Sequence, residues 1–376
     1  MSNSIFKEVT FTPQAFEKEF NLSNRRRFTK LILILESLID SGIIITASSN
    51  WKEKVLDFIE KYENDEKDDI SSLLKEIDDR QRIMSYPSHE NYDNEEEWIE
   101  KISLINNKSA FDFIAGTKNK GIVQIVESIE RENYKYTGAI VAKQTELFMQ
   151  NMLAPILSYA EIVKVFDPYF SLIPTVGNKE RFKKSLELIC ENLCNKHGKK
   201  NKATIEIHTS IKSMMNNFKQ FVWQYTSDVP KILKYFEQKY DHTITINIWE
   251  EVKKENEWHE RWIITNQCGV SIGKGSDISD WTDSTWGLLN WENIPEIEGK
   301  FNKNRNTYNF IGEINSSNVI KNQNPHNTLT YMTEKEKKVE KANQEIRIKK
   351  KLEDAENKLS KNKKIFNKNT KKWEFI

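Results

Sequence analysis

The sequence predicts an α/β (α+β) protein: a helical N-terminal region, then a mixed sheet covered by helices, then a charged helical tail. Three observations predict this order. Amphipathic helical spacing dominates the first part of the chain, short β-branched runs alternate with amphipathic segments in the middle, and lysine is frequent at the end. We expect a helical N-terminal domain at 1–150, an α/β domain at 151–330 and a charged helical tail at 331–376.

The composition is that of a folded protein without a strong overall charge. Of the 376 residues, 38% are hydrophobic and 30% are charged, and the formal net charge is +1. Attraction to nucleic acid or membrane must therefore come from local patches. The three cysteines, Cys190, Cys194 and Cys268, show no framework spacing, which is typical of a reducing compartment. No N-terminal run resembles a signal peptide, and no apolar run reaches the roughly 20 residues of a membrane span. We therefore expect a cytoplasmic protein.

In the N-terminal domain, the spacing of apolar residues predicts helices and one short strand. The strand is the β-branched run 43–46, which directly follows Gly42. A polar, acidic stretch at 85–97 is expected to form a loop. The expected helices are Leu31–Ile39, Trp51–Tyr62, Ser71–Ile83, Trp98–Ile105, Ile122–Arg131 and Gln144–Ala160, the last with Pro155 inside it.

The middle of the chain alternates between β-branched strands and amphipathic helices. The expected strands are Ile162–Phe166, Ala203–Thr209, Thr243–Trp249, Arg261–Thr265 and Gly269–Ile272. The helices expected between the first three strands are Lys179–Lys196 and Val229–Tyr240. This order, with short connections, predicts a sheet that is covered by helices.

One short segment carries residues that suit phosphate chemistry. His259 and Arg261 are two residues apart, so both side chains would leave the same face of a strand. An imidazole can attack phosphorus or transfer a proton, and a guanidinium can hold two phosphate oxygens. A glycine turn follows, where backbone N–H groups can approach an anion closely. We therefore expect catalysis at His259 and Arg261. The residues expected to bind phosphate are Gly273, Lys274, Gly275 and Ser276.

The spacing in this segment resembles the motif of the phospholipase D superfamily. That motif reads His-x-Lys, four residues, Asp, six residues and then Gly-Ser. The counts align here on His259, Arg261, Asn266, Gly273 and Lys274. A closer similarity is to the phospholipase-D-like C-terminal domain of MIT-domain proteins, which has His-x-Arg and then a Gly-x-Gly-x-Asp turn that would end here at Asp277. Similar His-x-Arg modules occur in bacterial proteins, some of them from phage-defence loci.

The resemblance implies a protein that handles a phosphodiester, either nucleic acid or a phospholipid-like molecule. It implies a phosphodiesterase or nuclease that needs no metal or other cofactor and forms a phosphohistidine at His259. It also implies a pocket rim at Asp167 and Tyr169, with Asn266 and Asp277 in supporting positions. Because catalysis in the superfamily uses two motifs and this chain has one, we expect a homodimer. An anti-phage effector would further imply a protein partner from the same defence system, besides nucleic acid or anionic lipid.

Two departures from the family pattern keep a second function open. Arg261 stands at the lysine position, and Asn266 stands at the aspartate position. An amide cannot raise the basicity of an imidazole as a carboxylate would. The related MIT-linked domains are associated with binding rather than catalysis. The alternative is therefore a catalytically inactive phospholipase-D-like module that binds protein, nucleic acid or membrane.

Each of these residues also has a purely structural interpretation. His259 could be an inert polar residue on a sheet face, and Arg261 could simply pair with Glu260 or Asp277, which contributes little at a surface. Asp167 precedes a proline and could be an ordinary strand end.

Two other groups and the tail favour a structural role. A crowded set of tryptophans could stack on bases, but such rings are more often core or interface anchors. This set is Trp258, Trp262, Trp281, Trp286 and Trp291. Cys190, Cys194 and His197 could share a helix face, but zinc needs a fourth ligand, so we expect a buried face. The lysine-rich tail has interleaved acids and is expected to be a solvated helix rather than a contact with nucleic acid or lipid.

Overall fold

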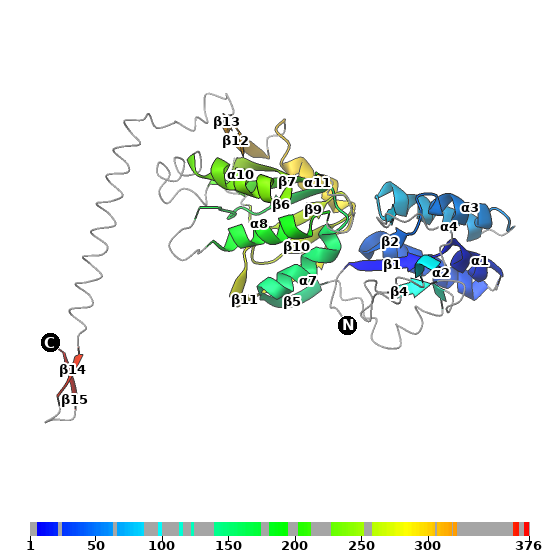
Figure 1. Cartoon of the computed structure of the whole chain (residues 1–376), viewed down its shortest axis with the longest axis horizontal. Helices are drawn as coiled ribbons and strands as arrows, with labels where there is room; N and C mark the ends of the chain where they lie inside the picture. The colour runs from blue at the N-terminus through cyan, green and yellow to red at the C-terminus, as the bar shows by residue number, and fades with distance from the viewer. Residues whose placement is uncertain are drawn as a thin grey trace.

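The computed structural model describes the chain in several stretches that together hold three sheets. The described residues are 6–21, 25–62, 66–85, 97–99, 113–115, 122–123, 139–173, 180–194, 202–211, 227–251, 258–304, 307–317, 319–321, 364–367 and 372–375. Within them the chain forms a four-stranded, a nine-stranded and a two-stranded sheet, with helices between the strands (Figure 1). The predicted α/β class is confirmed.

The first sheet lies in the region for which the sequence predicts helices. Its strand order is β3-β2-β1-β4, and its pairings are parallel. The strands are β1 (Lys7–Phe11), β2 (Gly42–Thr46), β3 (Ile83–Ser85) and β4 (Phe113–Ala115). Only the run in β2 is recognisable from sequence, because β1 carries the polar residues Glu8 and Thr10, both buried. The prediction of a helical domain with one short strand is therefore wrong in part: this unit holds a four-stranded sheet and is α/β.

The helices of this unit pack on one face of its sheet. They are α1 (Pro13–Asn21), α2 (Arg25–Ser41), α3 (Trp51–Ile59) and α4 (Glu66–Asp79). Their apolar side chains share a core with Val9, Phe11 and Ile44, whereas Ile43 and Ile45 belong to the core of the second sheet. Successive side chains of a strand point to opposite faces of the sheet, so Ile44 lies on the face that the helices cover and Ile43 and Ile45 lie on the other face. The helices predicted around 31–39 and 51–62 are confirmed by α2 and α3.

The helix α4 ends earlier than the sequence predicts. The expected helix Ser71–Ile83 starts within α4, but Gln81 has a φ of 54° and Ile83 opens β3. A left-handed residue stops a helix, so the predicted C-terminal end is wrong. The predicted helices Trp98–Ile105 and Ile122–Arg131 and the acidic loop at 85–97 lie almost entirely outside the described residues.

The second sheet contains all five strands predicted for the middle of the chain. Its order is β13-β12-β8-β7-β6-β9-β10-β11-β5. The central strands β6 (Ile162–Phe166), β7 (Thr204–Ser210) and β8 (Thr243–Glu251) are parallel, and the remaining pairings are antiparallel. The predicted antiparallel neighbours are β9 (Trp262–Thr265) and β10 (Gly269–Ile272). The strands missed from sequence are β5 (Ala139–Gln144), β11 (Ser279–Leu288), β12 (Tyr308–Asn315) and β13 (Val319–Lys321).

Helices cover this sheet as predicted. The helices α7 (Glu146–Leu157), α8 (Arg181–Asn192) and α10 (Val229–Tyr240) gather on one face (Figure 1) and share a core with the sheet. Pro155 lies inside α7. The helix α11 (Asn293–Lys300) contributes Ile294 and Ile297 to an aromatic cluster that contains Trp258 and Trp262. Both tryptophans and Trp286 are buried, so the core interpretation of these three rings is confirmed.

A buried arginine connects the two larger units. Arg82 is 2% exposed, and its Nε donates to the carbonyl oxygen of Gln267 at 2.7 Å. Its Nη1 donates to the carbonyl oxygens of Leu38, at 3.1 Å, and of Ile39, near the end of α2. Gln267 in turn donates from Nε2 to the carbonyl of Gln81 at 2.9 Å. The turn between β9 and β10 is thereby fixed to the first unit.

The three cysteines are free thiols inside the structure. Cys190, Cys194 and Cys268 are buried. Burial raises the pKa of all three thiols, that of Cys194 to about 11. The predicted burial is confirmed for both Cys190 and Cys194, but Cys194 follows the end of α8 with a φ of 55° and is not on the helix face; His197 lies outside the described residues. In the described ranges no group of three or more His, Cys, Asp or Glu side chains is placed to hold a metal ion.

The end of the chain differs from the predicted helical tail where it is described. The strands β14 (Lys364–Asn367) and β15 (Lys372–Phe375) pair in antiparallel fashion. The helical prediction is wrong for these residues, and the rest of the tail (331–363, 368–371 and 376) lies outside the described part. Among the described helices, none has both the length and the apolarity to cross a membrane.

Candidate functional site

Strand register brings three of the singled-out segments to one edge of the nine-stranded sheet. Phe166, the last residue of β6, pairs with Trp262, the first residue of β9. Asp167 and Arg261 therefore leave neighbouring antiparallel strands at the same edge. The loop 273–277 follows β10 at this edge, because Ile272 bonds through its N–H to the carbonyl of Arg261 at 2.9 Å. The structure thus gathers Asp167, Tyr169, Arg261 and the glycine turn.

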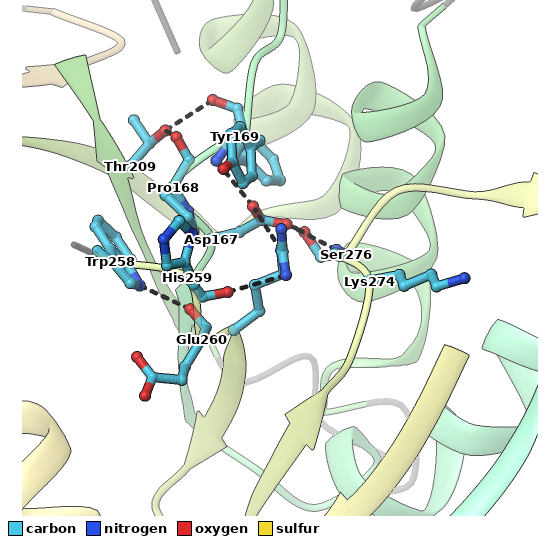
Figure 2. Close-up of polar contacts among 12 residues, drawn as sticks. Asp167, Pro168, Tyr169, Thr209, Trp258, His259, Glu260, Lys274 and Ser276 are labelled. Carbon is cyan, nitrogen blue, oxygen red and sulfur yellow. Dashed lines mark hydrogen bonds and ion pairs between the residues drawn. The ribbon is translucent and has the colours of Figure 1, made fainter. Parts of the chain in front are cut away.

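Asp167 is the buried centre of this cluster. Its side chain is 0% exposed. Oδ2 accepts the backbone N–H of Ser276 at 2.7 Å and its hydroxyl at 2.9 Å, and Oδ1 accepts the N–H of Tyr169 at 2.9 Å (Figure 2). Burial raises the pKa of Asp167 above its ordinary value, although these donors and Arg261 oppose the rise. Asp167 is therefore more than an ordinary strand end, because its carboxylate binds the loop to the end of β6.

Arg261 is held in one orientation by backbone oxygens. Its Nη1 donates to the carbonyl of His259 at 2.9 Å and to the carbonyl of Gly273 at 3.1 Å. Its buried Nε lies 3.8 Å from Oδ1 of Asp167, an ion pair too long for a hydrogen bond. The guanidinium carbon lies 5.0 Å from the centre of the Tyr169 ring. Of the three guanidinium nitrogens, Nη1 alone makes hydrogen bonds to the described residues, and neither Nε nor Nη2 does.

Gly275 adopts a backbone conformation that the loop needs. Its φ is +108°, and an added Cβ would lie 3.0 Å from Oδ1 of Asp277 and 3.4 Å from Oδ2 of Asp167. Its carbonyl accepts a hydrogen bond from Nε2 of the buried Gln144 at 2.7 Å. Glycine is required here both for the positive φ and for the close approach to the carboxylates.

The amides of this turn do not form the anion cradle that the sequence predicts. The N–H of Gly273 bonds to the carbonyl of Thr285 at 2.8 Å. The N–H of Lys274 bonds to Oγ of Ser284 at 3.1 Å, and that of Ser276 bonds to Asp167. Because protein groups already satisfy these three donors, the prediction of backbone phosphate binding is wrong for them. The side chain of Lys274 remains exposed.

His259 lies at the rim of the cluster but not on a strand. The strand β9 begins at Trp262, so His259 and Arg261 precede it, and the prediction of a shared strand face is wrong. His259 is exposed, and its backbone carbonyl accepts the hydrogen bond from Arg261. In Figure 2 the imidazole lies on the side of Pro168 and Trp258, opposite the side of Ser276 and Lys274.

Asn266 is far from the cluster. It follows the opposite end of β9, and its Oδ1 accepts the N–H groups of Glu161 at 3.1 Å and Ile162 at 3.4 Å. Its Nδ2 donates to the side chain of Gln81. Five residues of extended chain separate Asn266 from Arg261 by about 16 Å. The supporting role predicted for Asn266 at the phosphate is therefore wrong, because the strand carries it away.

Sequence reasoning missed several residues around the loop. Gln144 and Ser284 bind its backbone, and Nη1 of Arg181 lies 3.6 Å from Oδ2 of Asp277. Burial raises the pKa of Asp277, and Arg181 opposes the rise. These partners come from α8, β5 and β11, and no sequence spacing links them to the motif.

A second histidine beside Asp167 also escaped the sequence analysis. The carbonyl of His208 accepts the N–H of Asp167 at 3.0 Å. The ring is stacked on Phe166 at 4.4 Å, and its Nδ1 accepts the indole N–H of Trp249 at 3.0 Å. Burial lowers the pKa of His208, although Glu206 opposes this. A neutral, packed imidazole of this kind is a core residue.

The fold and the cluster together define an α/β protein with a cationic site at a sheet edge. No protein-family model and no curated protein matches the chain. Among solved structures, a similarity is found to TrmBL2, an archaeal chromatin protein whose structure shows a novel mode of DNA binding. The identity is 9%, the match covers 63% of this chain and 80% of that chain, and the TM-score is 0.24. A similarity at this level carries no argument about function.

Proposed function

We propose that this protein binds the phosphate group of a phosphodiester at Arg261, as a phospholipase-D-like recognition module without turnover. The observation that carries the proposal is the fixed guanidinium. Two carbonyls hold Nη1 and a buried carboxylate lies 3.8 Å from Nε, so the guanidinium is ordered before a ligand arrives. A cation that is already ordered loses less entropy on binding. The exposed side chain of Lys274 adds positive charge to the same loop.

Binding without turnover is favoured by where the other motif residues lie. Asn266, which aligns with the aspartate of the superfamily, is at the opposite end of β9. Three of the backbone amides in the turn, those of Gly273, Lys274 and Ser276, are bonded to Thr285, Ser284 and Asp167. A phosphohistidine at His259 would lack both of these supports.

The proposal is tested by the affinity of the purified chain for a short fluorescent oligonucleotide. Replacing Arg261→Ala removes charge-assisted hydrogen bonds and should weaken binding about tenfold or more. The control is Lys231→Ala on α10, which removes a more exposed cation elsewhere on the domain, with a side chain 78% exposed against 16% for Arg261. The proposal fails if both variants bind as tightly as the unchanged protein, or if both lose the same affinity.

Hydrolysis is the second candidate function, and the exposure of the His259 imidazole at the rim favours it. Its test is cleavage of DNA, RNA and a generic phosphodiester in the presence of a chelator. Activity that disappears in His259→Ala, from a protein that is dimeric by size, would replace the binding proposal. Cleavage that survives in His259→Ala excludes this residue as the nucleophile.

A further inference from the structure

Tyr169 is an aromatic side chain that folding leaves exposed beside the candidate cation. Tyr169 is 47% exposed, although most aromatic residues in the described part of this domain are buried, among them Phe166, Phe170, Trp258 and Trp262. Its backbone N–H is fixed by Oδ1 of Asp167 at 2.9 Å. The backbone of Tyr169 is therefore held in place next to the site, while much of the residue is exposed to solvent.

The guanidinium of Arg261 lies over the Tyr169 ring. The distance from the guanidinium carbon to the ring centre is 5.0 Å, within the range of a cation–π contact. One side of the ring thus faces a positive charge that the carbonyls of His259 and Gly273 hold in place. With nearly half of the side chain exposed, the ring can receive a second planar group.

We propose that Tyr169 stacks on an unpaired base of a single-stranded nucleic acid whose phosphate is bound by Arg261. This inference rests on the proposed function, because it uses the same cation. It narrows the phosphodiester to nucleic acid, since a nucleobase offers a π-face to the ring and a phospholipid headgroup does not. The base occupies the side of the ring away from the guanidinium, so that ring, base and cation form one stack.

A purely structural role for Tyr169 predicts a different outcome. If the ring only steadies Arg261, its loss would weaken every anionic ligand alike. If the ring binds a base, its loss would weaken ligands that carry bases and leave bare phosphate unaffected. Three ligands therefore separate the two roles: a short oligothymidylate, an abasic oligomer with the same number of phosphates, and inorganic phosphate as a competitor.

The experiment compares Tyr169→Leu, Tyr169→Phe and the control Tyr235→Leu in the full chain. Tyr235 is 53% exposed on α10, so its replacement removes a comparable ring outside the site. We expect Tyr169→Leu to weaken oligothymidylate binding about tenfold, because stacking contributes on the order of 1–3 kcal/mol per base. Tyr169→Phe and Tyr235→Leu should bind as the unchanged protein does, and competition by inorganic phosphate should be the same in all of them.

Three outcomes would overturn the inference. The abasic oligomer could bind the unchanged protein as tightly as oligothymidylate does, or Tyr169→Leu could weaken inorganic phosphate by the same factor. Anionic phospholipid vesicles could also bind more tightly than the oligomer. In each of these cases a dependence on Arg261 would leave the proposed function intact. Loss of the Arg261 dependence itself would instead reject the proposed function.

Discussion

Asp167 combines a structural task with an unfavourable position for charge. Three donors from Ser276 and Tyr169 bind its oxygens, and Arg261 lies 3.8 Å away, yet the side chain is fully buried. The carboxylate therefore holds the loop and the tyrosine at the cost of its own hydration. Its protonation state affects both the stability of the chain and the position of the cation.

The raised pKa of Asp167 gives a testable pH dependence. Because burial raises the pKa of Asp167 in the folded chain above its ordinary value of about 3.8, the folded chain binds more protons than the unfolded chain in the window just above that value. The contribution of Asp167 to stability therefore falls as pH rises from about 4 through the folded pKa. Asp167→Asn should remove this part of the slope, as measured by thermal unfolding midpoints between pH 4 and 7.

The same variant carries a second readout. At neutral pH the NH2 group in Asp167→Asn cannot accept a hydrogen bond from Ser276 or Tyr169, and the ion pair is lost, which costs about 1–3 kcal/mol. Relief of the buried charge opposes this cost, so we expect a net loss smaller than that range. An unchanged pH slope would show that Asp167 is not the group responsible. Phosphate affinity should fall in parallel, because Arg261 and the loop lose their common partner.

At the scale of elements, the turn between β10 and β11 depends on one glycine. In Gly275→Ala a methyl group would meet the carboxylates of Asp277 and Asp167 at 3.0 and 3.4 Å, from a backbone with φ of +108°. We expect a loss of about 1–3 kcal/mol in unfolding free energy and a weaker phosphate site. Chemical denaturation measures the first effect. Lys274→Ala is the matched control, since its exposed side chain should leave stability unchanged; equal stability of both variants would contradict the expectation.

The strands with clear apolar alternation were predictable, and those with polar faces were not. In β8 isoleucine occupies alternate positions, and the burial of Ile244, Ile246 and Ile248 confirms the pattern. The sequence of β11, SDWTDSTWGL, has no comparable apolar face. A strand on the outer part of a sheet needs few apolar residues, so its sequence resembles a loop.

The candidate site was predictable in composition but not in geometry. Spacing identified Arg261 and the glycine turn, and both lie at one sheet edge. The spacing of the motif could not show that β9 lies between Arg261 and Asn266 and places them at its opposite ends. The spacing gives the number of residues between two positions but not the direction in which the chain runs between them. Nor could it show that the loop amides bond to Thr285 and Ser284, since these partners come from a strand that was not predicted.

At the scale of the whole molecule, Arg82 decides how firmly the first unit is joined to the second. It donates to three carbonyls from two units, and its guanidinium lies 5.5 Å from the Phe6 ring and 5.7 Å from the Trp291 ring. Its bonds to Leu38 and Ile39 place a cation at the negative end of α2. This junction meets the end of β9 opposite the phosphate candidate.

The variant Arg82→Met should weaken the junction between the two units, because methionine keeps apolar contacts but donates no hydrogen bonds. The change leaves buried carbonyls without a charged donor, which costs about 3 kcal/mol or more. We expect faster hydrogen exchange in β3 and in the turn 265–268, measured by mass spectrometry. Arg80→Met provides the comparison, because Arg80 also donates to Ile39 and lies 5.3 Å from the Trp291 ring, whereas its carboxylate partner Glu76 belongs to the first unit. Equal exchange in the two variants would show that Arg82 is not the principal connection.

The burial of the three thiols makes the folded chain suitable for site-selective labelling. A maleimide reacts with accessible thiolates, and Cys190, Cys194 and Cys268 are enclosed, with pKa values that burial raises. A cysteine introduced at the surface is then the preferred attachment point for a dye. Two introduced cysteines, one on each unit, would carry a pair of dyes that reports the separation of the two units in solution. The native cysteines can be left in place.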